Sequence, residues 1–233
     1  MLEAGYILLT VTMVTIIIFG YNAVLKKLNF EKLSEEKSVF FSDGKFIMEV
    51  NPDRFSRAGI KLYRKSWTDV LANLKAQTNV MTIEGGFLLS DPSGCWIYLM
   101  ESEEEFVLSE ERNTILGNLA GLSLESMDMK KSYAIFSLLG FKKTMGDEAS
   151  AWLAMTNEDG VGVSIMKPMN CPHLFFNPSL TYFNSGKNPE VIEKIRDLKI
   201  AITEEITHFN KEGLVDNIII RDPGGFGFFL FND

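Results

Sequence analysis

Histidine and cysteine are scarce in this sequence, whose 233 residues include only two of each. Imidazole is the commonest metal ligand in proteins, so two histidines leave little material for a zinc or iron site. Cys95 and Cys171 lie far apart and cannot build a disulfide framework, which favours the reducing cytoplasm. Basic runs are also missing, and the formal net charge is −8. This charge argues against a nucleic acid or an anionic membrane as partner.

Phosphate- and nucleotide-binding motifs are missing as well. There is no glycine-rich loop with a lysine, no dinucleotide fingerprint, and no nucleophilic serine in a strand–turn–helix context. The Asp-Pro-Gly-Gly segment at residues 222–225 is typical of a turn and not of a phosphate cradle. What the chain does have is 46% hydrophobic residues, enough for one large or two small domains with their own cores.

An uncharged run covers residues 5–25. A transmembrane helix needs about 20 residues, so this run could span a bilayer. The alternative is a buried strand over residues 6–12 that leads into a helix over residues 14–27, because a strand covered on both faces is continuously hydrophobic. Three threonines and one asparagine dilute the membrane signal, and the internal repeat described next favours the strand and helix.

Two segments of the chain repeat each other. Residues 86–99 and 217–230 both read as a strand, an Asp-Pro-x-Gly turn and a second strand. The offset between matching positions grows twice along the chain, each time by about ten residues. The second half therefore contains two insertions, near residues 169–177 and 203–214. Long inserted loops often carry function, and a neutral surface loop is the alternative.

Each half reads as a strand, a helix and three short strands, and then as the same series again. In the first half the expected strands span residues 6–12, 30–33, 38–42, 45–50, 59–63, 79–83, 86–90 and 95–100. In the second half a strand over residues 122–126 precedes a helix over residues 130–139, with Asp128 as its N-cap. The sequence predicts an α+β chain of four βαβββ modules, with domains at residues 1–105 and 118–233 and a connector at residues 106–117.

This organisation resembles the vicinal oxygen chelate superfamily, which includes glyoxalase I, extradiol dioxygenases, fosfomycin-modifying enzymes and bleomycin-binding proteins. The resemblance rests on the paired modules, on the Leu-Leu-Gly-Phe sequence at residues 138–141, and on the closing Asp-Pro-x-Gly strand. It covers nearly the whole chain. It implies the glyoxalase/bleomycin resistance/dioxygenase-like fold, in which paired modules curl a sheet into a cup whose concave face holds ligand and metal.

In that superfamily the metal ligands lie on the first, fourth, fifth and eighth strands of a domain. The matching residues of the first half are Thr10, Glu49, Gly59 and Tyr98. Those of the second half are Gly121, Ile165, Ser179 and Phe229. Only Glu49 keeps the residue type of the superfamily, and one carboxylate cannot hold a divalent ion. We therefore expect no metal ligands and no cofactor.

Several residues are candidates for binding or catalysis. Glu49 could be a general base, and the alternative is a strand-end carboxylate that lies in water or pairs with Arg54 or Lys61. The residues expected to bind a ligand are Thr10, Trp96, Tyr98, Gly227, Phe229 and Phe231. Core packing is the alternative for the aromatic residues, and the glycine could make room for a ligand or for a facing chain.

Both histidines lie near the insertions. Cys171 and His173 could form a nucleophile and its base, or hold a metal, although such pairs also occur by chance. His208 reads as a surface residue, and metal binding together with Glu204 or Glu205 is the alternative.

The sequence thus predicts a metal-independent binder of a small, partly apolar molecule, comparable to the bleomycin-binding members. One alternative is a lyase or dioxygenase of the same superfamily. It would need a divalent metal (Zn, Ni, Mn or Fe) held by Glu49 and at least two of His173, His208, Glu204 and Glu205. The other alternative is a protein–protein scaffold without a working cavity. We expect a cytoplasmic monomer or homodimer with a small-molecule ligand, no nucleic acid and no membrane.

Overall fold

The computed structural model describes residues 7–12, 23–35, 38–53, 57–102 and 114–233. Most of the helix predicted over residues 14–27 lies outside these ranges, although residues 23–27 are helical. Arg54 and most of the predicted connector also lie outside them. Among the described residues, no helix is long and apolar enough to cross a membrane.

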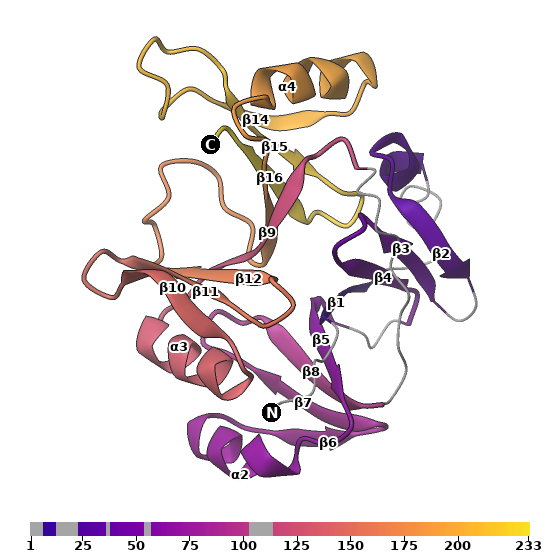
Figure 1. Ribbon diagram of the computed structural model, residues 1–233, viewed down its shortest axis with the longest axis vertical. Coiled ribbons are helices and arrows are strands. Elements are labelled where there is room, and N and C mark those ends of the chain that lie inside the picture. Colours follow the sequence, from indigo (N-terminus) through magenta and orange to yellow (C-terminus); the bar gives the residue numbers. More distant parts are fainter. Residues whose placement is uncertain (1–6, 13–22, 36–37, 54–56, 103–113) are drawn as a thin grey trace.

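The first half of the chain forms an eight-stranded sheet in the order β2-β3-β4-β1-β5-β8-β7-β6 (Figure 1). Its strands are β1 (Ile7–Thr12), β2 (Glu31–Glu35), β3 (Val39–Ser42), β4 (Ile47–Asn51), β5 (Gly59–Arg64), β6 (Met81–Ile83), β7 (Gly86–Ser90) and β8 (Trp96–Glu101). Helix α2 (Thr68–Gln77) connects β5 to β6. All eight strands predicted for this half are confirmed, with ends that differ by at most two residues.

The second half repeats this topology as the sheet β10-β11-β12-β9-β13-β16-β15-β14. Its strands are β9 (Asn118–Glu125), β10 (Lys142–Asp147), β11 (Trp152–Thr156), β12 (Gly162–Met166), β13 (Ser179–Phe183), β14 (Ile202–Ile206), β15 (Asn217–Arg221) and β16 (Gly227–Phe231). Helix α3 (Met129–Leu138) packs on β12, and helix α4 (Asn188–Asp197) packs on β15. The side chain of Asp128 accepts a hydrogen bond from Lys131 N, which confirms the predicted N-cap. The α+β fold of four modules is therefore the observed one.

The two Asp-Pro-x-Gly turns have the same hydrogen bonds in both halves. Gly94 N donates to Asp91 O and Gly225 N donates to Asp222 O, each at 3.0 Å. Both glycines have positive φ angles, 82° and 91°, which residues with a side chain rarely adopt. The repeat seen in the sequence is thus a repeat of backbone geometry.

Strand β9 begins four residues earlier than the prediction at residue 122. Gly121 has a φ of 139°, and a Cβ there would lie 1.9 Å from the carbonyl oxygen of Gly162. The pairing with β13 skips one residue at this point, since Gly121 faces Thr181 and Leu119 faces Tyr182. Gly121, which lies just before the predicted strand, therefore carries a β-bulge inside a longer strand.

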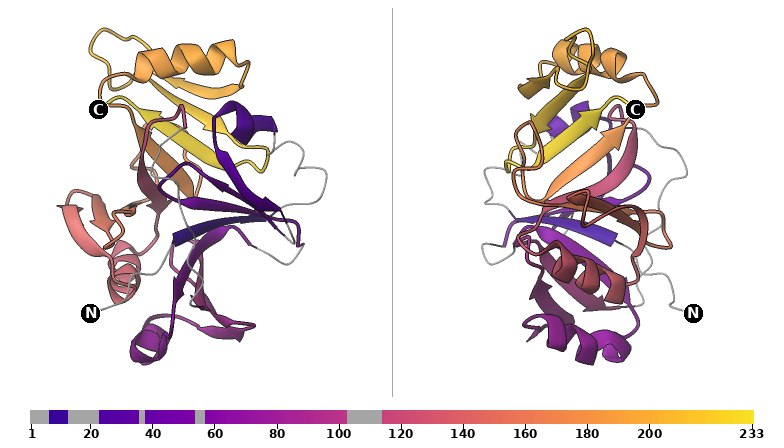
Figure 2. Two further views of the ribbon diagram at one scale, coloured as in Figure 1. Left: turned by 45° about the vertical axis from the view of Figure 1, so that its right-hand side comes forward. Right: turned by 90° about the vertical axis from the view of Figure 1, so that its left-hand side faces the viewer.

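The two halves share one hydrophobic core. Helices α2 and α3 pack against each other across the junction, whereas α4 lies at the opposite end of the molecule from α2 (Figure 1, Figure 2). Two buried carboxylates of the first half also accept hydrogen bonds from side chains of the second half. Asp43 accepts a hydrogen bond from the Tyr182 hydroxyl at 3.0 Å, and Asp91 accepts one from the Ser132 hydroxyl at 2.6 Å. These contacts hold strand β13 and helix α3 of the second half against the first half.

Candidate functional site

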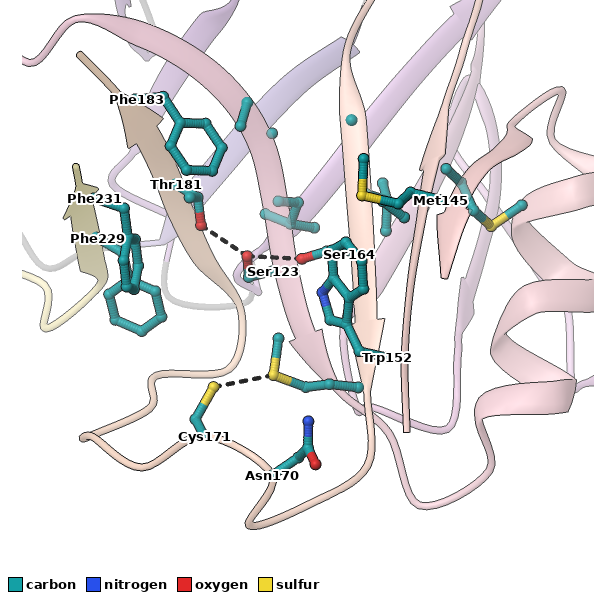
Figure 3. A pocket seen from close by; sticks show the side chains of 18 of the residues that line it. Ser123, Met145, Trp152, Ser164, Asn170, Cys171, Thr181, Phe183, Phe229 and Phe231 are labelled. Atoms are coloured by element: carbon teal, nitrogen blue, oxygen red, sulfur yellow. Dashed lines mark hydrogen bonds between the residues drawn. The ribbon is translucent and has the colours of Figure 1, made fainter. Parts of the chain in front are cut away.

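A cavity of about 580 Å³ lies on the inner face of the second sheet (Figure 3). Its base is formed by β9, β12 and β13, and its walls by β10, β11, β16 and the two insertions. Most of the lining residues are aliphatic, aromatic or sulfur-containing; those whose side chains face the cavity include Met145, Trp152, Met166, Phe175, Phe183, Phe209, Phe229 and Phe231. A cavity of this size and composition is typical of a site for a small organic molecule.

Three hydroxyl groups meet at the base of the cavity. The Ser123 hydroxyl lies 2.9 Å from that of Ser164 and 2.7 Å from that of Thr181. Ser123 is 5% exposed, whereas its two neighbours are half-buried. Figure 3 shows this hydroxyl triad between an aromatic wall, which includes Phe229, and Trp152 on the other side. The cavity therefore combines a largely apolar wall with a group of three hydroxyls at its base.

Both predicted insertions contribute to the wall of this cavity. The first supplies residues 170–173 and Phe175, and the second supplies Phe209. The insertions also contact each other, because Leu174 N donates a hydrogen bond to Glu204 Oε2 at 2.7 Å. The insertions therefore form part of the cavity wall, and a functional role for them stays a prediction.

The structure places His173 among aromatic rings. Its ring centroid lies 5.3 Å from that of Phe229 and 5.4 Å from that of Phe231. Its Nδ1 lies 2.8 Å from the carbonyl oxygen of Leu174, which can only accept, so Nδ1 carries the hydrogen. His173 thus closes the cavity over the last strand by packing, and its second nitrogen stays available to a ligand.

Cys171 lines the same cavity as a neutral thiol. Its Sγ–H donates to Met166 Sδ at 3.2 Å. Burial, assisted by the negative charge of Glu125, raises the pKa of Cys171 to about 11. A thiol with such a pKa is a poor nucleophile at neutral pH, because the thiolate is the reactive form. The geometry therefore does not support the nucleophilic role that the spacing from His173 suggested.

Phe229 and Phe231 line the cavity, as the sequence predicted for a ligand site, whereas Gly227 does not. A Cβ at Gly227 would lie 2.7 Å from Cδ2 of Phe176, a residue of the first insertion. Of the two readings of this glycine, the facing chain is the one observed. Phe176 belongs to a small cluster with Phe229, Ile206 and Ile219, which fills the end of the cup over β14 and β15. One end of the cup is thus packed and the other is open.

The remaining predicted residues belong to the first sheet. Glu49 is 3% exposed, and its carboxylate bonds to Lys61 Nζ at 2.5 Å and to the Ser38 hydroxyl at 2.8 Å. It is thus a buried partner of Lys61, one of the two cations expected from the sequence. Lys61 Nζ also lies 5.7 Å from the centre of the Tyr98 ring. A role of Glu49 as general base stays a prediction.

Trp96 and Tyr98 follow the alternation of β8, in which Ile97 and Leu99 are fully buried and these two are half-buried. The Tyr98 hydroxyl accepts from Arg57 N at 2.9 Å and lies 3.1 Å from Arg57 O. Thr10 of β1 pairs with Glu49 and with Gly59 in the sheet. None of the three lines the cavity of the second half, so their role in ligand binding stays a prediction.

The donor set of the second half does not fit a divalent metal. Of the positions matched to metal ligands, Ile165 is fully buried in the core and Ser179 is 1% exposed. The side chains that meet inside the cavity on the first, fourth, fifth and eighth strands are Ser123, Ser164, Thr181 and Phe229. Neutral hydroxyls and a phenyl ring offer no carboxylate, imidazole or thiolate, the groups that hold such ions.

The alternative ligand set around Glu49 is also not assembled. Glu204 holds the backbone of Leu174, and Glu205 pairs with Arg196 at 2.7 Å. His208 is exposed against Phe209. Within the ranges that the structure describes, no three His, Cys, Asp or Glu side chains are grouped so that they could hold a metal ion.

Solved structures with a similar architecture include several dioxygenases. A mutant of homoprotocatechuate 2,3-dioxygenase from Brevibacterium fuscum is 15% identical, with a TM-score of 0.64 over 100% of this chain and 71% of that chain. A 2,2',3-trihydroxybiphenyl 1,2-dioxygenase from Sphingomonas wittichii is 14% identical, with a TM-score of 0.56 over 99% of this chain and 90% of that chain. The fold is the glyoxalase/dioxygenase-like fold.

Another similar structure is a xylose isomerase-like TIM barrel/4-hydroxyphenylpyruvate dioxygenase fusion protein, which is 12% identical with a TM-score of 0.59. All of this chain aligns to it, but the chain spans only 49% of its length. No family model and no curated protein sequence matches the chain. At these identities the comparisons show the fold alone.

Sequence reasoning missed the hydroxyl triad and Trp152. The three hydroxyl residues belong to strands that are 41 and 58 positions apart in the sequence. The signal that could have found them is that side chains along a strand point alternately to the two faces of the sheet. Ser123, Ser164 and Thr181 all lie between residues that face the core, so they face the other side.

Proposed function

We propose that this chain belongs to the glyoxalase/bleomycin resistance/dioxygenase superfamily and that it binds a small, largely apolar molecule without a metal. The cavity of the second half carries this proposal, because it has aromatic and aliphatic walls at the place where the resemblance implies a site. Phe229 and Phe231 would supply contact area, and the hydroxyls would orient the ligand.

The shared fold with dioxygenases does not by itself suggest ring cleavage, because one fold hosts many functions. The positions that would hold a metal carry hydroxyls and a phenyl ring, so we derive no metal-dependent step. We propose a small molecule as the partner. The net charge of −8 argues against a nucleic acid or a membrane as a partner. We also propose a cytoplasmic monomer or homodimer.

A thermal-shift screen of small organic molecules, followed by calorimetry of the hits, tests the proposal. We expect stabilising ligands, because a molecule that binds only the folded state raises the unfolding temperature. The affinity should not change when a chelator is present. Stoichiometric iron, manganese, zinc or nickel that a chelator removes together with ligand affinity would contradict the proposal.

A variant that fills the cavity locates the site. Ala154 lines the cavity and pairs with Ser164 on the neighbouring strand, so Ala154→Phe would place a ring inside the cavity. Thr82→Phe is the matched control, because Thr82 is an exposed strand residue of the first sheet. We expect Ala154→Phe to abolish binding of the hits and Thr82→Phe to leave it unchanged. Equal affinities in the two variants would place the ligand elsewhere.

A further inference from the structure

The hydroxyl triad has more hydrogen-bonding capacity than its own bonds use. Three hydroxyl groups carry three hydrogens, and the two bonds among Ser123, Ser164 and Thr181 use two of them. Whichever way these bonds run, one hydrogen is left to point away from the triad, together with unused lone pairs. A half-buried donor in an apolar cavity gains most from an acceptor that a ligand brings to it.

The lining of the cavity gives no support to a charged ligand. Among the described residues that line it there is no lysine, arginine, aspartate or glutamate. Glu125 does not line the cavity, and its negative charge raises the pKa of the Cys171 thiol, which does. An anion in this place would lose part of its hydration without gaining a cation from the lining, which weakens its binding.

We infer that the triad of Ser123, Ser164 and Thr181 binds one oxygen atom, a hydroxyl or carbonyl oxygen, of an uncharged ligand whose apolar body lies between Trp152 and the aromatic wall of β16. This inference rests on the proposed function and names its ligand class. A ligand hydroxyl suits the triad best, since it accepts the free hydrogen and donates to one of the lone pairs. The triad thus takes the place in which the fold can carry metal ligands and replaces metal coordination by neutral hydrogen bonds.

Three probes with one carbon body test the inference by calorimetry at neutral pH: 4-tert-butylphenol, tert-butylbenzene and 4-tert-butylbenzoate. The phenol is neutral and has one oxygen, the hydrocarbon has none, and the benzoate is an anion. We expect the phenol to bind about tenfold more tightly than the hydrocarbon, which is the effect of one neutral hydrogen bond. The benzoate should bind more weakly than the phenol by roughly a hundredfold, because its charge is not compensated.

The variant Ser123→Ala/Ser164→Ala/Thr181→Val removes all three hydroxyls and nearly keeps their shapes. Removing every partner at once leaves no hydroxyl unsatisfied, so the fold should tolerate it. In this variant we expect the phenol and the hydrocarbon to bind equally. The matched control is Thr144→Val, because Thr144 lines the cavity outside the triad and bonds to Ala154 O. The control should keep the preference for the phenol.

Several results would overturn the inference, and the first two need no variant. The wild-type protein could bind phenol and hydrocarbon equally, it could bind the benzoate most tightly, or the triple variant could keep the preference for the phenol. In each of these cases the cavity still binds a ligand, so the proposed function stands. If no probe binds although the thermal-shift screen yields ligands, the inference alone is wrong. If the screen is empty as well, the proposed function fails with it.

Discussion

Replacing Tyr182 by phenylalanine tests the contact that holds a strand of the cavity against the first half of the chain. The Tyr182 hydroxyl donates to Asp43 Oδ2 at 3.0 Å, and both side chains are buried. The ring stacks on Phe228 at a centroid distance of 6.4 Å, and phenylalanine keeps this packing. The variant loses one hydrogen bond to a carboxylate and leaves that carboxylate with one partner fewer. We expect the free energy of unfolding to fall by about 2 kcal/mol at neutral pH.

The size of this loss depends on pH through Asp43. Burial raises the pKa of Asp43, and hydrogen bonds from Phe46 N, Lys45 N and the Tyr182 hydroxyl counteract the rise. Without the hydroxyl, the pKa of Asp43 in the folded state lies still further above that of the unfolded state. A raised carboxyl pKa gives stability that is present at low pH and is lost as the pH rises through the folded-state pKa. Tyr182→Phe should therefore cost more at pH 7.5 than at pH 4, where more of the carboxyl is neutral.

Urea unfolding at both pH values measures this difference, with tryptophan fluorescence and far-UV circular dichroism as independent probes of one transition. For a slope of about 3 kcal/mol/M, a loss of 2 kcal/mol moves the midpoint by about 0.7 M. Tyr133→Phe is the control, because within the described residues the Tyr133 hydroxyl has no hydrogen bond; it should change stability by less than about 0.5 kcal/mol. An equal loss at both pH values, or a loss no larger than that of the control, would refute the reasoning.

Three further predictions concern single side chains. Gly227→Ala should destabilise the protein by about 1–3 kcal/mol, seen as a lower melting temperature, because the new Cβ would lie 2.7 Å from the ring of Phe176. Cys171 should react with a thiol reagent at neutral pH far more slowly than a free thiol, since a pKa of about 11 leaves little thiolate, and fast labelling would contradict its burial. Lys61→Met should cost about 3 kcal/mol in urea unfolding because it removes the Lys61 ammonium group from the buried Glu49 carboxylate; adding Glu49→Gln should recover much of this loss, and an equal loss in both variants would show that the ion pair is not the cause.

Most of the secondary structure could be predicted from the sequence because each element carries a local signal. Alternating hydrophobic residues mark strands such as β8, and Asp128 marks the start of α3. The internal repeat extended these signals, since each half supported the interpretation of the other. The miss at the start of β9 came from Gly121, whose role depends on a close contact with Gly162 of another strand. No local pattern records such a contact.

The candidate site could be predicted only in part. The aromatic residues of β16 stand out in the sequence because they are large and close together, and Phe229 and Phe231 do line the cavity. Ser123 and Thr181 do not stand out, because serine and threonine are common on strands and become a site only through the pairing of β9 with β13. That pairing includes a bulge, so counting positions from the ends of the strands leads to the wrong residue.

The pairing of the strands also explains why the two cups differ although their topology is the same. Thr10 faces Glu49 between β1 and β4 as Ser123 faces Ser164 between β9 and β12. Lys61 faces Tyr98 between β5 and β8 in the same way as Thr181 faces Phe229 between β13 and β16.

At equivalent positions, then, the first cup carries Glu49 and Lys61 where the second carries Ser164 and Thr181. The charged side chains are long and bond to each other across the inner face of the sheet, and they use their hydrogen-bonding capacity there. The hydroxyl side chains are short, so they leave space above them and one hydrogen unused. Two differences on one scaffold thus place an ion pair in the first half and a group of hydroxyls in the second, and the function that we propose belongs to the half with the smaller side chains.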